Sequence, residues 1–147
     1  MSVSTELKQA LKTKIEGLSS VQKVYGHEEM NPDGWPAVML TAQDMQGEFS
    51  SNAENSRVYA YKAFILFPVG QDYPASTDMN RMEYAEQVIA TVIDEIVNDM
   101  DTDFELTGSD ALYMNAADCL WSYTKLENGE ARSAQITLSI YTELRVV

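Results

Sequence analysis

Apolar residues recur at helical spacing near the start of the chain. Three of them lie four residues apart: Leu7, Leu11 and Ile15. Ser4 precedes them in the position of an N-cap, and Gly17 follows where a left-handed residue often ends a helix. The pattern predicts one amphipathic helix from Ser4 to Glu16 with a single buried stripe.

A second and longer helical pattern occupies the middle of the chain. Its apolar positions, three or four residues apart, are Met82, Ala85, Ile89, Val92, Ile93, Ile96 and Met100. Its polar side carries Glu83, Glu86, Asp94, Glu95 and Asp99. The pattern predicts a helix capped by Thr77 or Asp78 that runs to about Met100.

Strand patterns fill the segment between these two helices. A short strand is predicted from Val21 to Tyr25, and Pro36 leads into another from Ala37 to Thr41. A long strand follows from Arg57 to Phe67. Both of its faces are largely apolar, which predicts a central strand covered on both sides for much of its length. The polar residues 43–56 before it form either a loop or an extended hairpin arm.

The pattern in the last third of the chain predicts a β-hairpin. A strand is predicted from Leu120 to Lys125, and Asn128-Gly129 is the strongest short signal for a hairpin turn. From Ser133 onward polar and apolar residues alternate, which is typical of a strand with one wet face in an antiparallel pair. Cys119, just before the first of these strands, is expected to be a buried structural thiol.

These elements predict an α+β fold in the order α-β-β-β-α-β-β. The economical architecture is a single antiparallel or mixed β-sheet with two helices packed on one face. No linker, repeat or low-complexity tract divides the chain, so residues 1–147 are expected to form one domain.

Composition excludes several classes of function. The chain has 147 residues and a formal net charge of −13, which opposes nucleic-acid binding and attachment to an anionic membrane. No apolar run reaches transmembrane length, and the first residues do not resemble a secretory signal. One cysteine and one histidine can form neither an internal disulfide nor a structural zinc site.

Catalytic chemistry is not evident in the sequence. The single histidine, His27, stands in a turn beside two glutamates and is expected to be a surface residue. The seven glycines form no phosphate-binding loop. We therefore expect no enzyme activity, no catalytic residue and no bound cofactor.

One acidic motif has the spacing of a calcium loop. Asp99, Asp101, Asp103 and Asp110 match positions one, three, five and twelve of an EF-hand. Phe104 stands at the sixth position, where the sharp turn needs glycine, and no helix pattern follows. A solvated acidic helix end is the better interpretation, so no metal site is predicted.

Some aromatic residues stand in loops or at strand ends and are candidate interface anchors. They are Trp35, Phe49, Tyr73 and Trp121. Phe49 is the one large apolar residue of the polar segment 43–56. Aromatic side chains at the centre of a patch contribute strongly to binding. The alternative is that these side chains pack onto their own domain.

Several ordered segments together resemble a known protein family. These are Trp-Pro-Ala-Val-Met-Leu at 35–40, Glu-Asn-Ser-Arg-Val-Tyr-Ala-Tyr-Lys at 54–62, Phe-Ile-Leu-Phe at 64–67, the apolar helix core at 88–96 and Ala-Gln-Ile-Thr-Leu at 134–138. With the N-terminal amphipathic helix, this pattern resembles the tail terminator and tail-completion proteins of long-tailed bacteriophages, the lambda-like minor tail group. The resemblance covers nearly the whole chain.

The resemblance implies a structural virion protein with the same sheet-and-helix fold. Such a protein assembles with itself as a ring, typically a hexamer, on the last ring of the major tail tube protein. It ends tail elongation and presents a surface to the head–tail connector proteins. The implied location is the head-proximal end of the tail, after synthesis in the host cytoplasm. DNA would pass through the ring without specific binding, and no membrane is involved.

Two other classes of function remain open. The first is a head–tail connector or neck protein, whose small α+β domains have similar sequence patterns. The second is a small ligand-binding domain or enzyme that uses acidic residues in a pocket. Such a domain would be stabilised strongly by a saturable ligand or metal.

Overall fold

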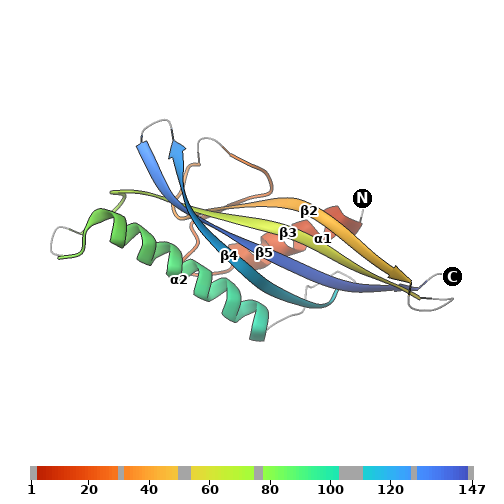
Figure 1. The fold of residues 1–147 in the computed structure, drawn as a ribbon. Coiled ribbons are helices and arrows are strands. Elements are labelled where there is room, and N and C mark those ends of the chain that lie inside the picture. Colours follow the sequence, from red (N-terminus) through yellow and green to blue (C-terminus); the bar gives the residue numbers. More distant parts are fainter. Residues whose placement is uncertain are drawn as a thin grey trace.

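Two helices and five strands follow one another in the predicted order α-β-β-β-α-β-β (Figure 1). The computed structural model describes residues 3–29, 32–49, 54–74, 78–102, 111–126 and 129–145. The elements are α1 (Val3–Glu16), β1 (Lys23–Tyr25), β2 (Ala37–Phe49), β3 (Glu54–Pro68), α2 (Arg81–Thr102), β4 (Ala111–Leu126) and β5 (Gly129–Arg145). The predicted α+β class is confirmed.

The five strands form one mixed sheet in the order β1-β2-β3-β5-β4. β1 pairs with β2 in parallel, and the other three pairs are antiparallel. β3 is the central strand, as predicted. It pairs with β2 on one side and with β5 on the other, with Tyr61 opposite Leu138. β4 lies at one edge of the sheet.

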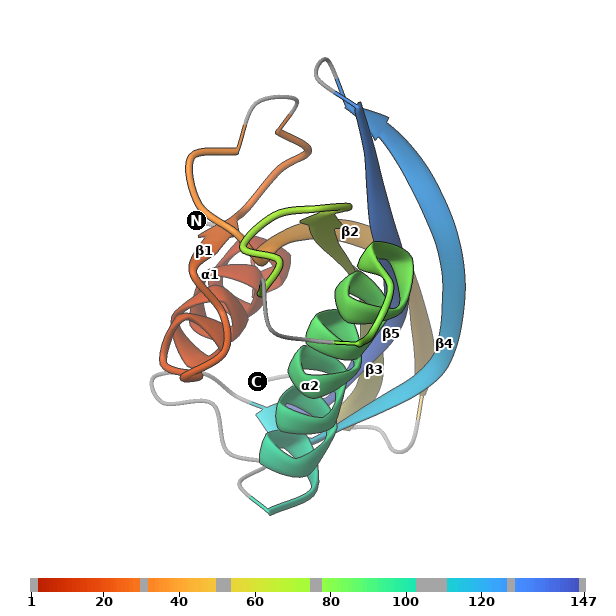
Figure 2. The same cartoon turned by 90° about the vertical axis from the view of Figure 1, so that its left-hand side faces the viewer.

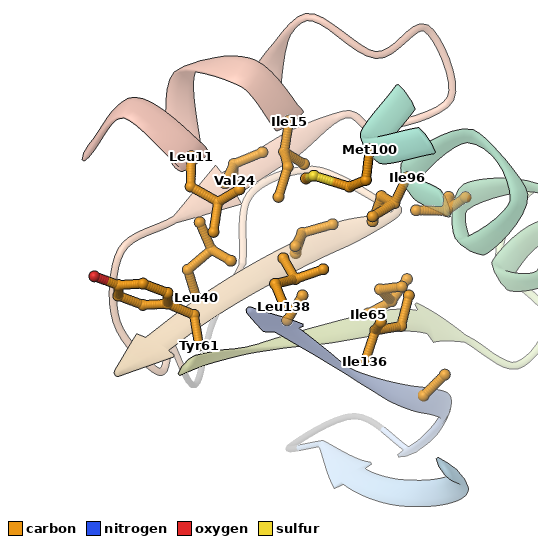
Figure 3. Close-up of a cluster of buried hydrophobic side chains, with 14 of the residues drawn as sticks. Leu11, Ile15, Val24, Leu40, Tyr61, Ile65, Ile96, Met100, Ile136 and Leu138 are labelled. Carbon is orange, nitrogen blue, oxygen red and sulfur yellow. The ribbon is translucent and has the colours of Figure 1, made fainter. Parts of the chain in front are cut away.

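Both helices cover the same face of this sheet (Figure 2). α1 buries Leu7, Leu11 and Ile15, as its spacing predicts. α2 buries Ala85, Ile89, Val92, Ile96 and Met100. These side chains meet the inward-facing residues of the sheet, among them Leu40, Tyr61, Ile65, Ile136 and Leu138 (Figure 3). The helical and strand periodicities therefore converge on one core.

The predicted helix caps were wrong. Asn80 caps α2, because its Oδ1 accepts a hydrogen bond from the Glu83 N–H at 3.0 Å. Asp78 precedes that cap, and Thr77 lies outside the described residues. Ser4 lies inside α1. Gly17 does not have a positive φ, and its N–H instead closes a tight turn onto the Lys14 carbonyl at 3.3 Å.

Polar contacts tie the two helices together. Lys14 Nζ on α1 lies 3.2 Å from Asp99 Oδ2 near the end of α2. One turn earlier, the Glu95 carboxylate accepts hydrogen bonds from Ser19 Oγ at 2.9 Å and the Ser20 N–H at 3.1 Å. A carboxylate near a helix C-terminus opposes the helix dipole, and the Lys14 ammonium offsets that cost.

The prediction that β3 is covered on both sides for much of its length was wrong. The face away from the helices is only half-buried at Val58, Ala60 and Lys62. Burial on this face is confined to a small cluster at the end of the sheet near Leu66. Apolar residues on both faces of β3 therefore reflect a short second cluster rather than a second covering layer.

The described parts of the polar segment, residues 43–49 and 54–56, belong to the two strands of a hairpin arm. β2 continues past the predicted Thr41 to Phe49, and β3 begins at Glu54, earlier than predicted. Phe49 pairs with Asn55 in this arm, and the register shifts between Ala42 and Met45. The side chain of Phe49 lies outside what the structure describes.

The strand pattern of the last third is confirmed and extended. Leu126 of β4 pairs with Gly129 of β5, which has a φ of 142°. The predicted hairpin is therefore present, although Glu127 and Asn128 lie outside the described residues. The alternation in β5 is confirmed at four buried positions: Ala134, Ile136, Leu138 and Ile140.

Replacing the buried tyrosine of β3 should loosen α1. The Tyr61 hydroxyl donates a hydrogen bond to the Ser4 carbonyl at 2.6 Å. We expect Tyr61→Phe to lower the free energy of unfolding by about 1 kcal/mol, measured by urea denaturation. Tyr123→Phe is the control and should change it by less than about 0.5 kcal/mol, because Tyr123 is exposed. Equal effects of the two changes would contradict the role given to this bond.

The Tyr61→Phe substitution should also change how the free energy of unfolding depends on pH in alkaline solution. Burial raises the pKa of the Tyr61 phenol, although the Ser4 hydroxyl, whose oxygen lies 3.3 Å from the phenol oxygen, acts in the opposite direction. Above the ordinary tyrosine pKa of about 10, the unfolded chain therefore loses this proton before the folded chain does. The contribution of Tyr61 to the free energy of unfolding is complete below the ordinary tyrosine pKa and declines as pH rises through the raised pKa of the folded chain. The unfolding free energies of wild type and Tyr61→Phe should converge there.

Candidate interaction surface

β4 is a long edge strand whose outer side has no neighbour among the described residues. It pairs only with β5, over the whole of Ala111–Leu126, whereas the sequence predicted a strand only from Leu120 to Lys125. A strand at the edge of a sheet presents unpaired N–H and C=O groups on its outer side. Such an edge is a template for pairing with another chain.

A bulge divides β4 into two halves. The register with β5 shifts between Ala117 and Leu120, and Asp118 has a φ of 56°. Aspartate tolerates this left-handed conformation better than most residues, and bulges of this kind bend a strand. Cys119 lies within the bulge and is exposed, so the prediction of a buried thiol was wrong.

The half of β4 after the bulge exposes large apolar side chains. Leu120 is 62% exposed, Tyr123 48% and Trp121 38%. Trp121 pairs with the inward-facing Ala134, so Trp121 and Tyr123 lie on the helix side of the sheet and Leu120 lies on the other. Apolar side chains on both faces of a free edge are typical of an interface.

An arginine of β5 holds the two exposed aromatic rings. The guanidinium carbon of Arg132 lies 4.9 Å from the centroid of the Trp121 ring and 4.5 Å from that of Tyr123. One guanidinium nitrogen donates to the Ser122 carbonyl at 2.7 Å. These contacts fix the rings in place before any partner binds. Tryptophan, tyrosine and arginine are the residues that most often dominate binding energy at protein interfaces.

A cleft lies on the opposite face of the sheet at the same end. Met39, Leu66 and Ala131 are buried there, although no helix covers this face. The cleft has a volume of about 290 Å³, and Met39, Leu66 and the half-buried Phe64 form its floor. One wall is the segment after β1 with Glu28 and Glu29. The other is the end of β4 from Thr124 to Leu126.

Two other predicted interface aromatics pack onto their own domain. The Tyr73 hydroxyl donates to the Met79 carbonyl, and its ring meets that of Tyr84 edge-on at 5.9 Å. The Arg81 guanidinium lies over the same Tyr73 ring at 5.6 Å. Trp35 is half-buried and packs against both hydrophobic clusters. Of the four candidates, only Trp121 has a side chain described as exposed.

The groups considered for chemistry are scattered. His27 is exposed, as predicted, and its Nδ1 lies 2.9 Å from the Glu28 carbonyl oxygen. Asp99 and Asp101 lie within α2, so a calcium loop cannot begin at Asp99. Asp103 and Asp110 lie outside the described residues. Within the described part of the chain, no three potential metal ligands gather at one place.

Comparison with protein-family models and with curated proteins adds no information about the surface defined by β4. No protein-family model matches the chain, and no curated protein matches it. Neither described helix is both long and apolar enough to cross a membrane. Any assignment of function therefore depends on the residues themselves.

Cys119 should react more slowly than its exposure suggests. Partial desolvation raises the pKa of its thiol, which lowers the fraction of reactive thiolate at a given pH. Cys119 is the only cysteine, so a thiol reagent such as Ellman's reports on it alone. We expect the rate to rise with pH through a higher midpoint in the folded chain than in the chain unfolded in urea. Equal midpoints would contradict this account.

Proposed function

We propose that this chain is a structural protein of a long-tailed phage. In this role it forms a ring through the open edge of β4 and terminates the tail tube. The observation that carries the assembly step is the free edge after the bulge, with Leu120 and Trp121 exposed on its two faces. A neighbouring strand would cover the unpaired backbone and both side chains together.

Strand direction supports a second copy as the neighbour. Three successive antiparallel pairings make β4 run opposite to β2. β2 pairs with β1 only as far as Met39, so its outer edge from Leu40 to Phe49 has no partner among the described strands. Copies related by rotation about an axis along the strands would place β4 antiparallel to β1 and β2 of the next copy. The first half of β4 would lie beside the free part of β2 and the half after the bulge beside β1, because Ser122 is level with Ala37 and Lys23. Contacts of this head-to-tail kind close into rings.

The tail assignment depends on the family resemblance of the sequence and on charge. Residues 37–40 and 54–67, which carry much of that resemblance, fall in β2 and β3. α2 exposes carboxylates, among them Glu83, Glu86 and Asp94. A net charge of −13 would keep a channel from holding DNA. It would also make ring formation more favourable in magnesium or salt, which screen repulsion between copies.

Removing the exposed indole should weaken self-association. We expect Trp121→Ser to raise the dissociation constant of the oligomer at least about tenfold, because a buried aromatic anchor contributes 1.4 kcal/mol or more. Native mass spectrometry and analytical ultracentrifugation over a range of protein and magnesium concentrations measure this. Met82→Ser is the matched control, since Met82 is 45% exposed but lies on α2. Equal weakening by both variants would exclude β4 as the interface.

The tail role has its own test. Purified tail tubes mixed with the protein should carry it at one end when viewed by negative-stain electron microscopy, and the Trp121→Ser variant should cap fewer tubes. Six-fold rings in the same images support a terminator, whereas twelve-fold rings favour the connector alternative. Failure to bind tubes would exclude the terminator role even if the chain forms rings.

A further inference from the structure

The cleft on the uncovered face is a second surface with a chemistry different from that of the β4 edge. Met39 and Leu66 in its floor are each only 5% exposed, and Phe64 lies beside them. The Glu29 N–H lies 3.4 Å from Met39 Sδ, so the segment after β1 is held down on this floor. The cleft is therefore part of the folded chain and is present without a partner.

The size and lining of the cleft indicate the kind of group that it accommodates. A volume of about 290 Å³ is at the lower limit for small-molecule pockets, which suits one or two protein side chains. The floor is apolar, and the flexible thioether of Met39 adapts to different shapes. Among the described residues of the lining, two carboxylates, Glu28 and Glu29, stand against one ammonium, Lys125. This combination favours an apolar side chain with positive charge beside it.

We propose that this cleft binds an extended segment of a partner protein in which a large apolar side chain is flanked by lysine or arginine. A second copy of this chain is a poorer occupant, because its 23 acidic residues outnumber its 10 Lys and Arg residues, whereas a basic segment is attracted to the acidic rim. The cleft opens on the face of the sheet away from the helices, whereas a neighbouring strand would pair with the edge of β4 in the plane of the sheet. Binding in the cleft does not depend on ring formation.

Methionine methyl signals provide a direct test. The protein is labelled with ¹³C at its methionine methyl groups, and the Met39 signal is assigned by its loss in Met39→Leu. The probe is a blocked synthetic peptide, Gly-Ser-Lys-Leu-Lys-Ser-Gly, titrated to millimolar concentration. We expect a saturable shift of the Met39 signal. A peptide with Glu-Leu-Glu at its centre, and one with Lys-Ser-Lys, should each give a much smaller shift.

Two variants locate the binding on the protein. Glu28→Lys should weaken binding at least about threefold, whereas Glu86→Lys, the same charge change on α2, should leave it nearly unchanged. Thr124→Trp should fill the cleft and abolish the Met39 shift, with thermal unfolding used to confirm that the variant folds. These results together would support the cleft as the binding site.

Three results would overturn the proposal. The first is no Met39 shift at millimolar peptide, and the second is an equal shift with the acidic peptide. The third is a Met39 signal that moves with protein concentration alone, which would assign the cleft to a second copy. None of these bears on the edge of β4, because the Trp121→Ser experiment is read from the oligomeric state and the tail-tube images.

Discussion

Burial of a single face of the sheet beneath α1 and α2 is the constraint on which the rest of the molecule depends. Each leucine or isoleucine buried there contributes about 1.5–3 kcal/mol. β3 and β5 supply buried apolar side chains, including Ile65, Ile136 and Leu138, at every second position. A slip of one residue in the pairing of β3 with β5 would turn Ile65 or Ile136 to the outside. The core therefore fixes the register of the central strands. The bond from Tyr61 to Ser4 adds a polar anchor where α1 begins.

Because the two helices cover only one face of the sheet, they also determine which residues stay exposed. α2 lies over the centre of the sheet, while the β4–β5 hairpin extends past the helices (Figure 1). The exposed Leu120, Trp121 and Tyr123 all belong to this end of β4. In the same region the uncovered face keeps a few apolar side chains, which half-buried residues such as Tyr25, Trp35 and Leu126 partly shield. Both candidate binding surfaces are consequences of where the helices stop.

Strong periodicity made most of the fold predictable. Local features, such as helix caps and the bulge in β4, were not predictable. The buried positions of α2 and β5 follow directly from their spacing, because packing against one face imposes that period. The cap at Asn80 was missed because Thr77 and Asp78 are equally good capping residues, and only tertiary contacts decide between them. Apolar residues on both faces of β3 suggested cover on both sides, since sequence cannot tell a short cluster from a full layer. The bulge at Asp118, which exposes Cys119, has no periodic signal.

The surface after the bulge is where local sequence and fold disagree most. Leu120, Trp121 and Tyr123 would suit a strand covered on both faces, but they lie on an edge strand, and all three side chains are exposed. Natural proteins usually protect such an edge with charge or with a short strand. Here the bulge bends the edge, and Arg132 holds the rings in place without hiding them. An apolar edge that is ordered in advance costs less entropy to bind than a mobile one. The proposed partner strand would account for this disagreement, because it would cover side chains that folding of the isolated chain leaves exposed.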